Sequence, residues 1–334
     1  MNLSWPIVLA VLFGAVLHAG WNALVKSSGD KEVDTALVHF LGALVAVPPL
    51  LVYGPPPPVA WPYIACSLLI HVAYYITLAG AYKHGDLGLT YPIMRGSAPL
   101  LVALGSSFVL GESLTPLAWT GVMAVTVGVV LVGLARHEPA RPLEGLIPEG
   151  EARRSSIEPL AQGLDPAALG PRGSPLRAHR PAEVPQRRRA LLFALANACV
   201  IATYTFVDGS GVRATVAAGQ LAVSYVMVLF VLDGVPYPAL VYFRRDAGAR
   251  RAILDYARRR WPLAALGGAA SMGSYTIALW AMTKAPVASV SALRETSVLF
   301  ASALGVWVLK ERFGVQRAAG AGVIVAGVVA LRFS

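Results

Sequence analysis

Long stretches without any charged residue alternate with short polar connections along this chain. Four of them, 3–25, 35–82, 113–135 and 261–283, contain no Asp, Glu, Lys or Arg. A hydrocarbon core about 30 Å thick is crossed by roughly 20 residues of α-helix, so each stretch is long enough to span a bilayer. The pattern therefore predicts an all-α polytopic membrane protein.

Proline, glycine and charged residues divide the apolar sequence into ten predicted helices. The run 35–82 counts as two helices, because Pro48-Pro49 and then four consecutive prolines at 55–58 interrupt it. The predicted transmembrane segments are 5–25, 35–53, 59–82, 87–110, 116–135, 190–210, 214–243, 261–283, 287–309 and 314–332.

A polar segment, 136–189, separates the first five predicted helices from the last five. It holds nine prolines, ten arginines and seven acidic residues. Such a composition buries too little apolar surface to offset the entropy of ordering the chain. We therefore expect a disordered cytoplasmic linker between two domains, 1–135 and 190–334; a regulatory or partner-binding insert is the alternative.

Basic residues are distributed unevenly among the connections. Most of the 28 Lys and Arg residues follow the first, third, fifth, seventh and ninth predicted helices, and seven of them form a cluster at 244–260 that we interpret as a topology anchor. The positive-inside rule then places the odd-numbered connections in the cytoplasm and both termini outside. This distribution accounts for the net charge of +10 without a nucleic-acid partner.

The two halves match each other at an offset of 199 residues. The matched pairs include two charges in an apolar background and two glycines: Arg95 and Arg294, Glu112 and Glu311, Gly121 and Gly320, Gly128 and Gly327. Because each copy has an odd number of helices, the second copy enters the membrane from the opposite face. Inverted repeats of this kind are typical of secondary transporters.

Several stretches resemble the EamA family of the drug/metabolite transporter superfamily, in particular its bacterial permeases. They are His18–Lys26, Ala81–Asp86, Tyr91–Gly96, Leu110–Thr115 and Leu309–Phe313. The resemblance implies two inverted five-helix repeats around a central cavity, alternating access, and a multi-pass location in the bacterial cytoplasmic (inner) membrane. Cargo in this family is amino acids, metabolites or drug-like compounds, generally exported. The segment 136–189 is longer than the connection in most members, and external termini depart from the usual orientation.

Charged groups at membrane depth are the first candidates for a binding site. Arg95 lies 8 residues into its predicted helix and Arg294 lies 7 into its own. They are expected either to line the cavity and bind a carboxylate or phosphate, or to brace neighbouring helices. Glu295 points about 100° away from Arg294 on a helix, so Arg95 is its expected partner. It could alternatively carry a coupling proton, but two neighbouring arginines favour its ionised form.

Aromatic and polar residues extend this candidate site. Tyr75, Tyr91, Tyr275 and Trp280 fall on helices that face the cavity in the EamA family, with core packing as the alternative. Trp21 and Asn22 join them as cavity candidates, although aromatic residues near helix ends also serve as interfacial anchors. For Glu112 and Glu311 we expect that each caps or orients the helix that follows it, with a gating ion pair as the alternative.

The sequence thus favours a secondary active transporter that exports small amino-acid-like metabolites, organic anions or drug-like compounds. Uptake of an organic anion, a membrane enzyme and a non-transporting scaffold are the alternatives. We find no Walker motif, H-E-x-x-H or His/Cys cluster, and therefore expect no cofactor or metal. Expected partners are a small-molecule substrate and the bilayer. Coupling to protons or other ions is compatible with the sequence, as is either a monomer or a homodimer. Small residues repeated in the fifth and tenth predicted helices, Ala118, Ala124, Gly128, Ala318, Gly322 and Ala326, favour internal packing over dimerisation.

Overall fold

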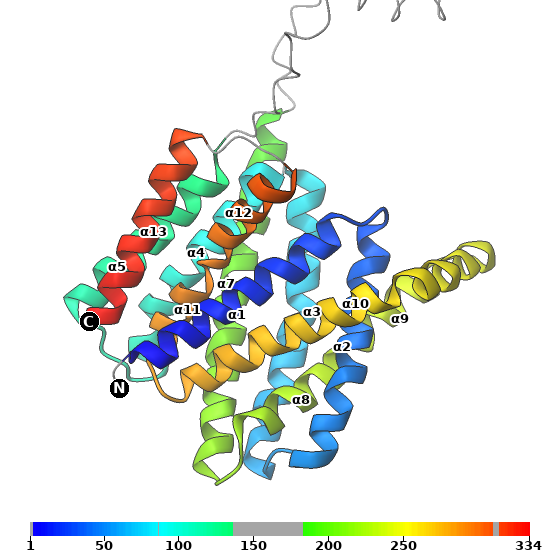
Figure 1. Ribbon diagram of the computed structural model, residues 1–334, viewed down its shortest axis with the longest axis horizontal. Coiled ribbons are helices and arrows are strands. Elements are labelled where there is room, and N and C mark those ends of the chain that lie inside the picture. The colour runs from blue at the N-terminus through cyan, green and yellow to red at the C-terminus, as the bar shows by residue number, and fades with distance from the viewer. Residues whose placement is uncertain (1–2, 86, 136–182, 310–313) are drawn as a thin grey trace, which may run out of the picture.

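The computed structural model describes residues 3–85, 87–135, 183–309 and 314–334 (Figure 1). Regular structure in these residues is helical throughout: α1 (Trp5–Lys26), α2 (Lys31–Tyr53), the 3-10 turn η1 (Pro58–Ala60), α3 (Trp61–His84), α4 (Leu87–Val109), α5 (Pro116–Gly133), α7 (Glu183–Ala217), α8 (Ala222–Asp233), α9 (Pro236–Phe243), α10 (Ala247–Met282), α11 (Val287–Arg294), α12 (Ser297–Leu309) and α13 (Val315–Phe333). Nine segments of the described chain are long and apolar enough to cross a membrane. The eighth predicted span forms part of α10, whose Gly, Ala and Ser content makes it less hydrophobic than the others.

The helices run back and forth between two faces of the bundle. Figure 1 shows both termini at the lower left, on the face that also carries the turns at 54–57, 218–221 and 283–286. We name this the termini face. The opposite face, at the top and right, carries the turns at 27–30 and 244–246 and is named the linker face. Both termini on one face is the arrangement that ten crossings require.

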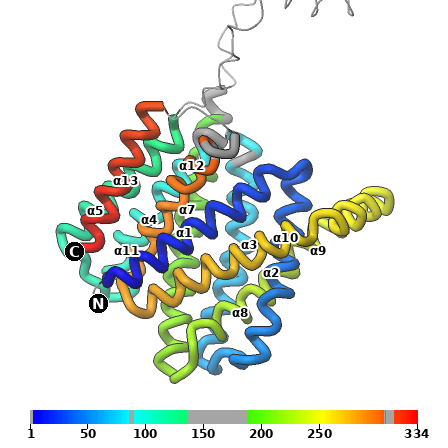
Figure 2. Tube along the Cα trace, in the orientation of Figure 1, coloured from blue at the N-terminus to red at the C-terminus, as the bar shows by residue number. Residues whose placement is uncertain are grey.

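The two halves of the chain interleave rather than pack as separate blocks. Helix α1 of the first half lies along α10 of the second, and α3 lies along α7, so the two sets of helices exchange partners (Figure 2). At the edge of the bundle α5 and α13 lie side by side (Figure 1). The repeated arrangement therefore brings equivalent helices of the two halves into contact.

Matched glycines form the contact between α5 and α13. A Cβ atom on Gly128 would lie 2.8 Å from the carbonyl oxygen of Gly320, and one on Gly327 would lie 2.9 Å from that of Gly121. Each glycine of one repeat thus faces a glycine of the other, as expected for helices related by a twofold axis. Close approach of this kind needs residues without side chains at the crossing points.

The small-residue stripe named from the sequence is correct only in part. Ala118 and Gly128 of α5 are buried as expected, but Ala318, Gly322 and Ala326 are exposed on α13. The glycines that pack internally, Gly320 and Gly327, lie on the other side of that helix. The four-residue spacing of small residues was correctly recognised, but on α13 the residues chosen lie on the exposed face of the helix.

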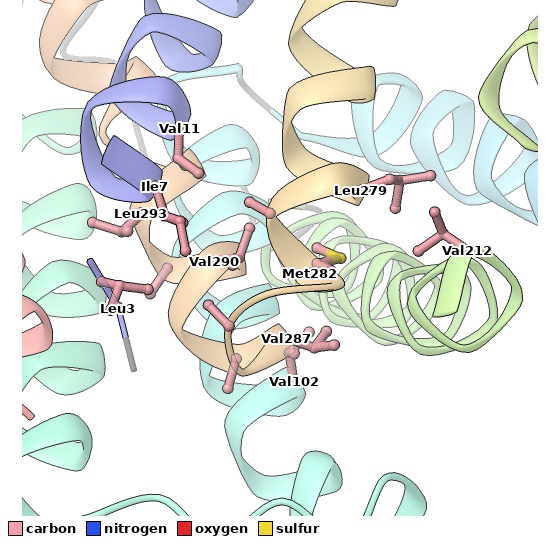
Figure 3. Packing of buried hydrophobic residues seen from close by; sticks show 14 of the residues in the cluster. Leu3, Ile7, Val11, Val102, Val212, Leu279, Met282, Val287, Val290 and Leu293 are labelled. Atoms are coloured by element: carbon pink, nitrogen blue, oxygen red, sulfur yellow. The ribbon is translucent and has the colours of Figure 1, made fainter. Parts of the chain in front are cut away.

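Helix α11 occupies the centre of the apolar core. All its residues from Val287 to Leu293 are buried. Figure 3 shows Val287, Val290 and Leu293 pointing towards side chains of α1, α4, α7 and α10. Up to Leu293 its side chains are apolar or small serine hydroxyls, so protein can enclose this short helix on every side.

Two predicted helices are broken. The predicted span 214–243 is α8 followed by α9, with Gly234 and Val235 between them, and residues 214–217 instead complete α7. The predicted span 287–309 is α11 followed by α12, interrupted at Glu295 and Thr296. At the second break Arg294 ends α11 and Glu295 precedes α12. A cation at a helix C-terminus and an acid at a helix N-terminus both complement the helix dipoles, which stabilises the break.

Two other helices extend beyond the predicted membrane segments. Helix α10 begins at Ala247, because Asp246 caps it by accepting a hydrogen bond of 2.8 Å from the backbone N–H of Ala249. Most of the predicted basic loop 244–260 is therefore helical. Helix α7 begins at Glu183, so the expectation of a disordered linker is wrong for 183–189; residues 136–182 lie outside the described part of the chain.

Candidate functional site

A cavity of about 790 Å³ lies between the two halves of the bundle. Side chains from α1, α2, α3, α4, α7, α8, α9, α10 and α11 line it. It reaches the surface at Lys31 and Glu32, which are exposed on the linker face. The residues that join the helices on the termini face do not line it. The volume is in the range of small-molecule binding sites, and the structure is open towards the linker face.

Arg95 of α4 is paired at the inner end of the cavity. Its Nε lies 3.0 Å from Oε2 of Glu295, an ion pair between buried side chains that joins the two repeats. Its Nη2 donates to Nε2 of His18 at 2.9 Å. Because a guanidinium can only donate, His18 must accept at Nε2 and is therefore neutral here. Glu295 thus compensates the charge of Arg95, as the sequence predicted.

Arg294 has a different environment from its repeat mate. Its guanidinium lies over the ring of Tyr275, with Cζ 5.2 Å from the ring centre. It forms no ion pair with any described residue. A cation–π contact leaves the N–H edge of a guanidinium available, so Arg294 can bind an anion from the cavity.

An aromatic wall leads from Arg294 towards the open end. The rings of Phe230 and Tyr275 lie 6.1 Å apart, and Tyr75 stacks on Tyr237 at 5.2 Å. The hydroxyl of Tyr75 donates to Asp233 at 3.3 Å, next to the break between α8 and α9. The cavity therefore has an arginine at one end of an aromatic wall and a carboxylate at the other.

The structure separates the candidate residues into two groups. Those that line the cavity are Trp21, Asn22, Tyr75, Tyr91, Arg95, Tyr275 and Arg294. Glu295 lies behind Arg95, where it is buried and outside the lining. Trp280 is wrong as a cavity candidate, because it is 37% exposed on the outer side of α10. Five residues separate it from Tyr275, which is about one and a half helical turns and places it on the opposite side.

Glu112 does not cap the helix that follows it, contrary to our expectation. Thr115 caps α5 by accepting from the N–H of Ala118 at 3.1 Å. Glu112 instead accepts from Arg213 at 2.5 Å and from the N–H of Val287, at the start of α11, at 3.0 Å. It therefore joins the two repeats on the termini face, which fits the gating alternative better. Its mate Glu311 lies outside the described residues.

Several lining residues were not predicted from the sequence. Asp233 was hidden within a single long apolar segment, although the turn-forming sequence Asp-Gly-Val-Pro could have indicated the break. His71 stacks on Tyr204, with ring centres 4.9 Å apart, and Asn197 donates to Thr77 at 2.9 Å. Both His71 and Asn197 line the cavity.

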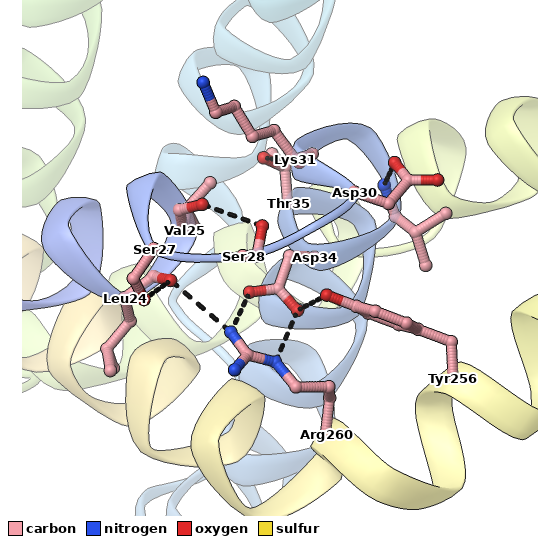
Figure 4. A network of polar contacts seen from close by, with 11 residues as sticks. Leu24, Val25, Ser27, Ser28, Asp30, Lys31, Asp34, Thr35, Tyr256 and Arg260 are labelled. Carbon is pink, nitrogen blue, oxygen red and sulfur yellow. Dashed lines mark hydrogen bonds and ion pairs between the residues drawn. The ribbon is translucent and has the colours of Figure 1, made fainter. Parts of the chain in front are cut away.

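Ion pairs surround the opening of the cavity on the linker face. Arg260 donates to Asp34 at 3.0 Å, and Tyr256 donates to the same carboxylate at 3.2 Å (Figure 4). Arg245 donates to Glu32 at 2.9 Å, a hydrogen bond that raises the pKa of the guanidinium. Two residues of the basic cluster, Arg260 of α10 and Arg245 just before it, thus bond to α2, in addition to any effect on topology.

Comparison with known proteins agrees with this arrangement. The model of the EamA-like transporter family matches residues 5–134 and 188–333. The chain belongs to this family. A crystal structure of another protein, 17% identical in sequence, superposes with a TM-score of 0.64 over 98% of this chain and 95% of the other. At this identity the likeness concerns the fold alone. The two family matches correspond to the two five-helix halves, so this EamA-like protein is a duplicated membrane transporter.

Proposed function

We propose that this EamA-like transporter exports small zwitterionic metabolites of the amino-acid type. The observation that carries the proposal is that Arg294 and Asp233 lie at opposite ends of an aromatic cavity. Arg294 forms no ion pair with any described residue. A carboxylate would bind the N–H edge of Arg294, and an ammonium would bind Asp233, which accepts the hydroxyl of Tyr75.

A second donor supports an anionic group at this end of the cavity. The indole N–H of Trp21 is buried and has no hydrogen-bond partner among the described residues. Its ring lies 5.4 Å from that of His18, which bonds to Arg95. A buried donor without an acceptor is costly, so a ligand oxygen at this position would be stabilising.

The direction of the opening supports export. The cavity reaches the linker face, which the positive-inside rule assigns to the cytoplasm. In this state the binding site would load from the cytoplasm. Release outside requires that the contacts of Glu112 and Arg213 on the termini face separate.

Metabolite profiling of medium and cytosol tests the proposal. Cells that express the wild type would be compared with cells that express Arg294→Ala or Asp233→Asn at matched membrane levels. Trp280→Ala is the control, because Trp280 is an aromatic residue of α10 outside the cavity. We expect an amino-acid-like compound enriched outside with the wild type and the control, and lost with both cavity variants.

Other outcomes would change or refute the proposal. Enrichment inside the cells would reverse the direction, and loss with Arg294→Ala alone would indicate an organic anion without an amine. A wild-type profile for Arg294→Ala would remove Arg294 from the binding site. Transport of the identified compound by purified protein in proteoliposomes would then exclude an indirect effect on metabolism.

A further inference from the structure

Asp208 of α7 is a fully buried carboxylate that is not part of the anion site. It lies nine residues before the end of α7 at Ala217, which corresponds to about 14 Å along the helix. That is close to half the thickness of a hydrocarbon core. Asp208 therefore lies near the middle of the membrane.

Hydroxyl groups surround this carboxylate. Tyr225 of α8 donates to Oδ1 at 2.9 Å, and Tyr275 of α10 donates to Oδ2. Ser67 of α3 is a third hydrogen-bond neighbour. Among the described residues, no Lys, Arg or His forms an ion pair with Asp208. This distinguishes it from Glu295 and Asp34, which each face an arginine.

Tyr275 connects Asp208 with the cavity, and His71 lies next to this connection. Tyr275 lines the cavity and bonds to Asp208 directly. His71 also lines the cavity, and its Nδ1 lies 2.8 Å from the carbonyl oxygen and 3.4 Å from the hydroxyl of Ser67. Nδ1 of a neutral His71 donates to that carbonyl, so His71 does not itself pass a proton to Asp208. The hydroxyl of Tyr275, which lies between the cavity and the carboxylate, provides the hydrogen-bonded path for a proton.

We propose that Asp208 is a proton-binding site whose occupancy is coupled to the anion site through Tyr275. This coupling rests on the proposed function, in which Arg294 binds the anionic group of the substrate. A proton from cavity water converts the carboxylate to the neutral acid, and its loss returns the proton to water. Protonation replaces the charged acceptor of the Tyr275 hydroxyl by a weaker one, and the ring of Tyr275 supports Arg294. Tyr275 therefore contacts both the proton site and the anion site. If proton binding changes the affinity for the anion, anion binding changes the affinity for the proton by the same factor.

The charged and titratable groups around Asp208 define the alternatives. Those that interact with Asp208 are Tyr204 on its own helix, His71 on α3, Tyr225 on α8 and Tyr275 on α10. Tyr63 and Cys66 on α3 lie next to Tyr225, and α7 and the helices packed against it also carry Arg213, Arg95, Asp233 and Arg294. Any of these groups could contribute to a pH-dependent signal. A test must therefore observe the carboxyl group itself.

Infrared difference spectroscopy provides this observation without a known substrate. The full-length protein in lipid would be titrated between about pH 5 and pH 9, a range in which a buried carboxyl can lose its proton. We expect a carboxylic-acid C=O band that disappears as the pH rises, is absent in Asp208→Asn, and remains in Glu295→Gln. Asn has nearly the same shape and can still bond to the tyrosines. If the wild type and Asp208→Asn have identical titration spectra, Asp208 is a structural group and the proposal is wrong.

Two tyrosine variants and one arginine variant test the coupling. Tyr225→Phe and Tyr275→Phe each remove one donor to the carboxylate, and we expect each to raise its proton affinity about tenfold. We expect Arg294→Gln to change that affinity in the wild-type background and to have little effect when combined with Tyr275→Phe. An equal effect of Arg294→Gln in both backgrounds would show that Tyr275 does not carry the coupling. These spectra can be measured even if metabolite profiling finds no transported compound. Failure of the proposed function can therefore be distinguished from failure of the proton-site proposal.

Discussion

The contact between α5 and α13 gives a sharp test of the duplicated architecture. Replacing Gly128 by Ala would place a Cβ atom 2.5 Å from Cγ1 of Ile324, 2.8 Å from the carbonyl oxygen of Gly320 and 2.9 Å from the backbone nitrogen of Ile324. The side chain of Ile324 can rotate, but the two backbone atoms cannot move without the helix. The helices must therefore separate to accept one methyl group.

The free-energy cost follows from two opposing effects. Overpacking of a close contact destabilises a protein by about 1–3 kcal/mol, whereas Ala stabilises a helix by roughly 1 kcal/mol relative to Gly. For Gly128→Ala the first effect is larger, because backbone atoms are among those displaced. Gly322 on α13 is a matched control, since nothing lies within 4 Å of the position that a Cβ atom would take there. Its replacement by Ala therefore retains only the favourable propensity.

Thermal unfolding of the detergent-purified protein, followed by tryptophan fluorescence, measures the difference. With roughly 2–4 °C for each kcal/mol in a chain of this size class, we expect Gly128→Ala to melt several degrees below the wild type. Gly322→Ala should melt at or slightly above it. The repeat mate Gly327→Ala should show a loss similar to that of Gly128→Ala. Equal melting temperatures for all three variants would refute the glycine contact. A lower melting temperature for only one of Gly128→Ala and Gly327→Ala would refute the symmetry of the contact.

Three further changes test the charged contacts. Glu295→Ala should lower stability by about 3–5 kcal/mol, seen as a lower melting temperature, because Arg95 becomes a buried charge without a counter-ion. Glu112→Gln should weaken the bonds to Arg213 and to the start of α11 and increase amide hydrogen exchange at residues 287–290 about tenfold; unchanged exchange would argue against gating. Asp34→Asn should cost about 2 kcal/mol, and added salt should not reproduce the loss in the wild type, because the carboxylate is buried.

The features that could be predicted from the sequence are those that depend on the composition of long segments or on matches between the two halves. Ten membrane helices follow from the lengths of the apolar runs, and the duplicated halves follow from Arg95 and Arg294 at equivalent positions. The pairing of Glu295 with Arg95 was also predictable. A buried acid is stabilised in its ionised form by a cation, and the neighbour of Glu295 in the sequence, Arg294, points in another direction along the helix.

The helix breaks were not predicted, for a physical reason. Apolar runs show that a segment is long enough to cross the membrane, but they carry no information on whether its backbone is continuous. At Glu295 the helix ends are stabilised by adjacent charges, and at Gly234 by a turn that is packed against α2. Asp233 was missed for the same reason. Its place in the cavity lining becomes visible only when the break between α8 and α9 is known.

The contacts between the repeats differ in kind from place to place, and this difference suggests which of them move. The glycine contact of α5 and α13 is close and uncharged, so separating it exposes backbone and gains nothing in return. On the termini face the repeats are joined by polar and ring contacts: Glu112 bonds to Arg213 and Val287, Ser224 donates to the carbonyl of Tyr53, and Trp5 contacts Arg332 and Phe333. The bonds of Glu112 are worth about 1–3 kcal/mol. That is comparable with the few kcal/mol that separate two populated conformations of a protein. In the proposed transport cycle we therefore expect the termini face to open while α5 and α13 stay together.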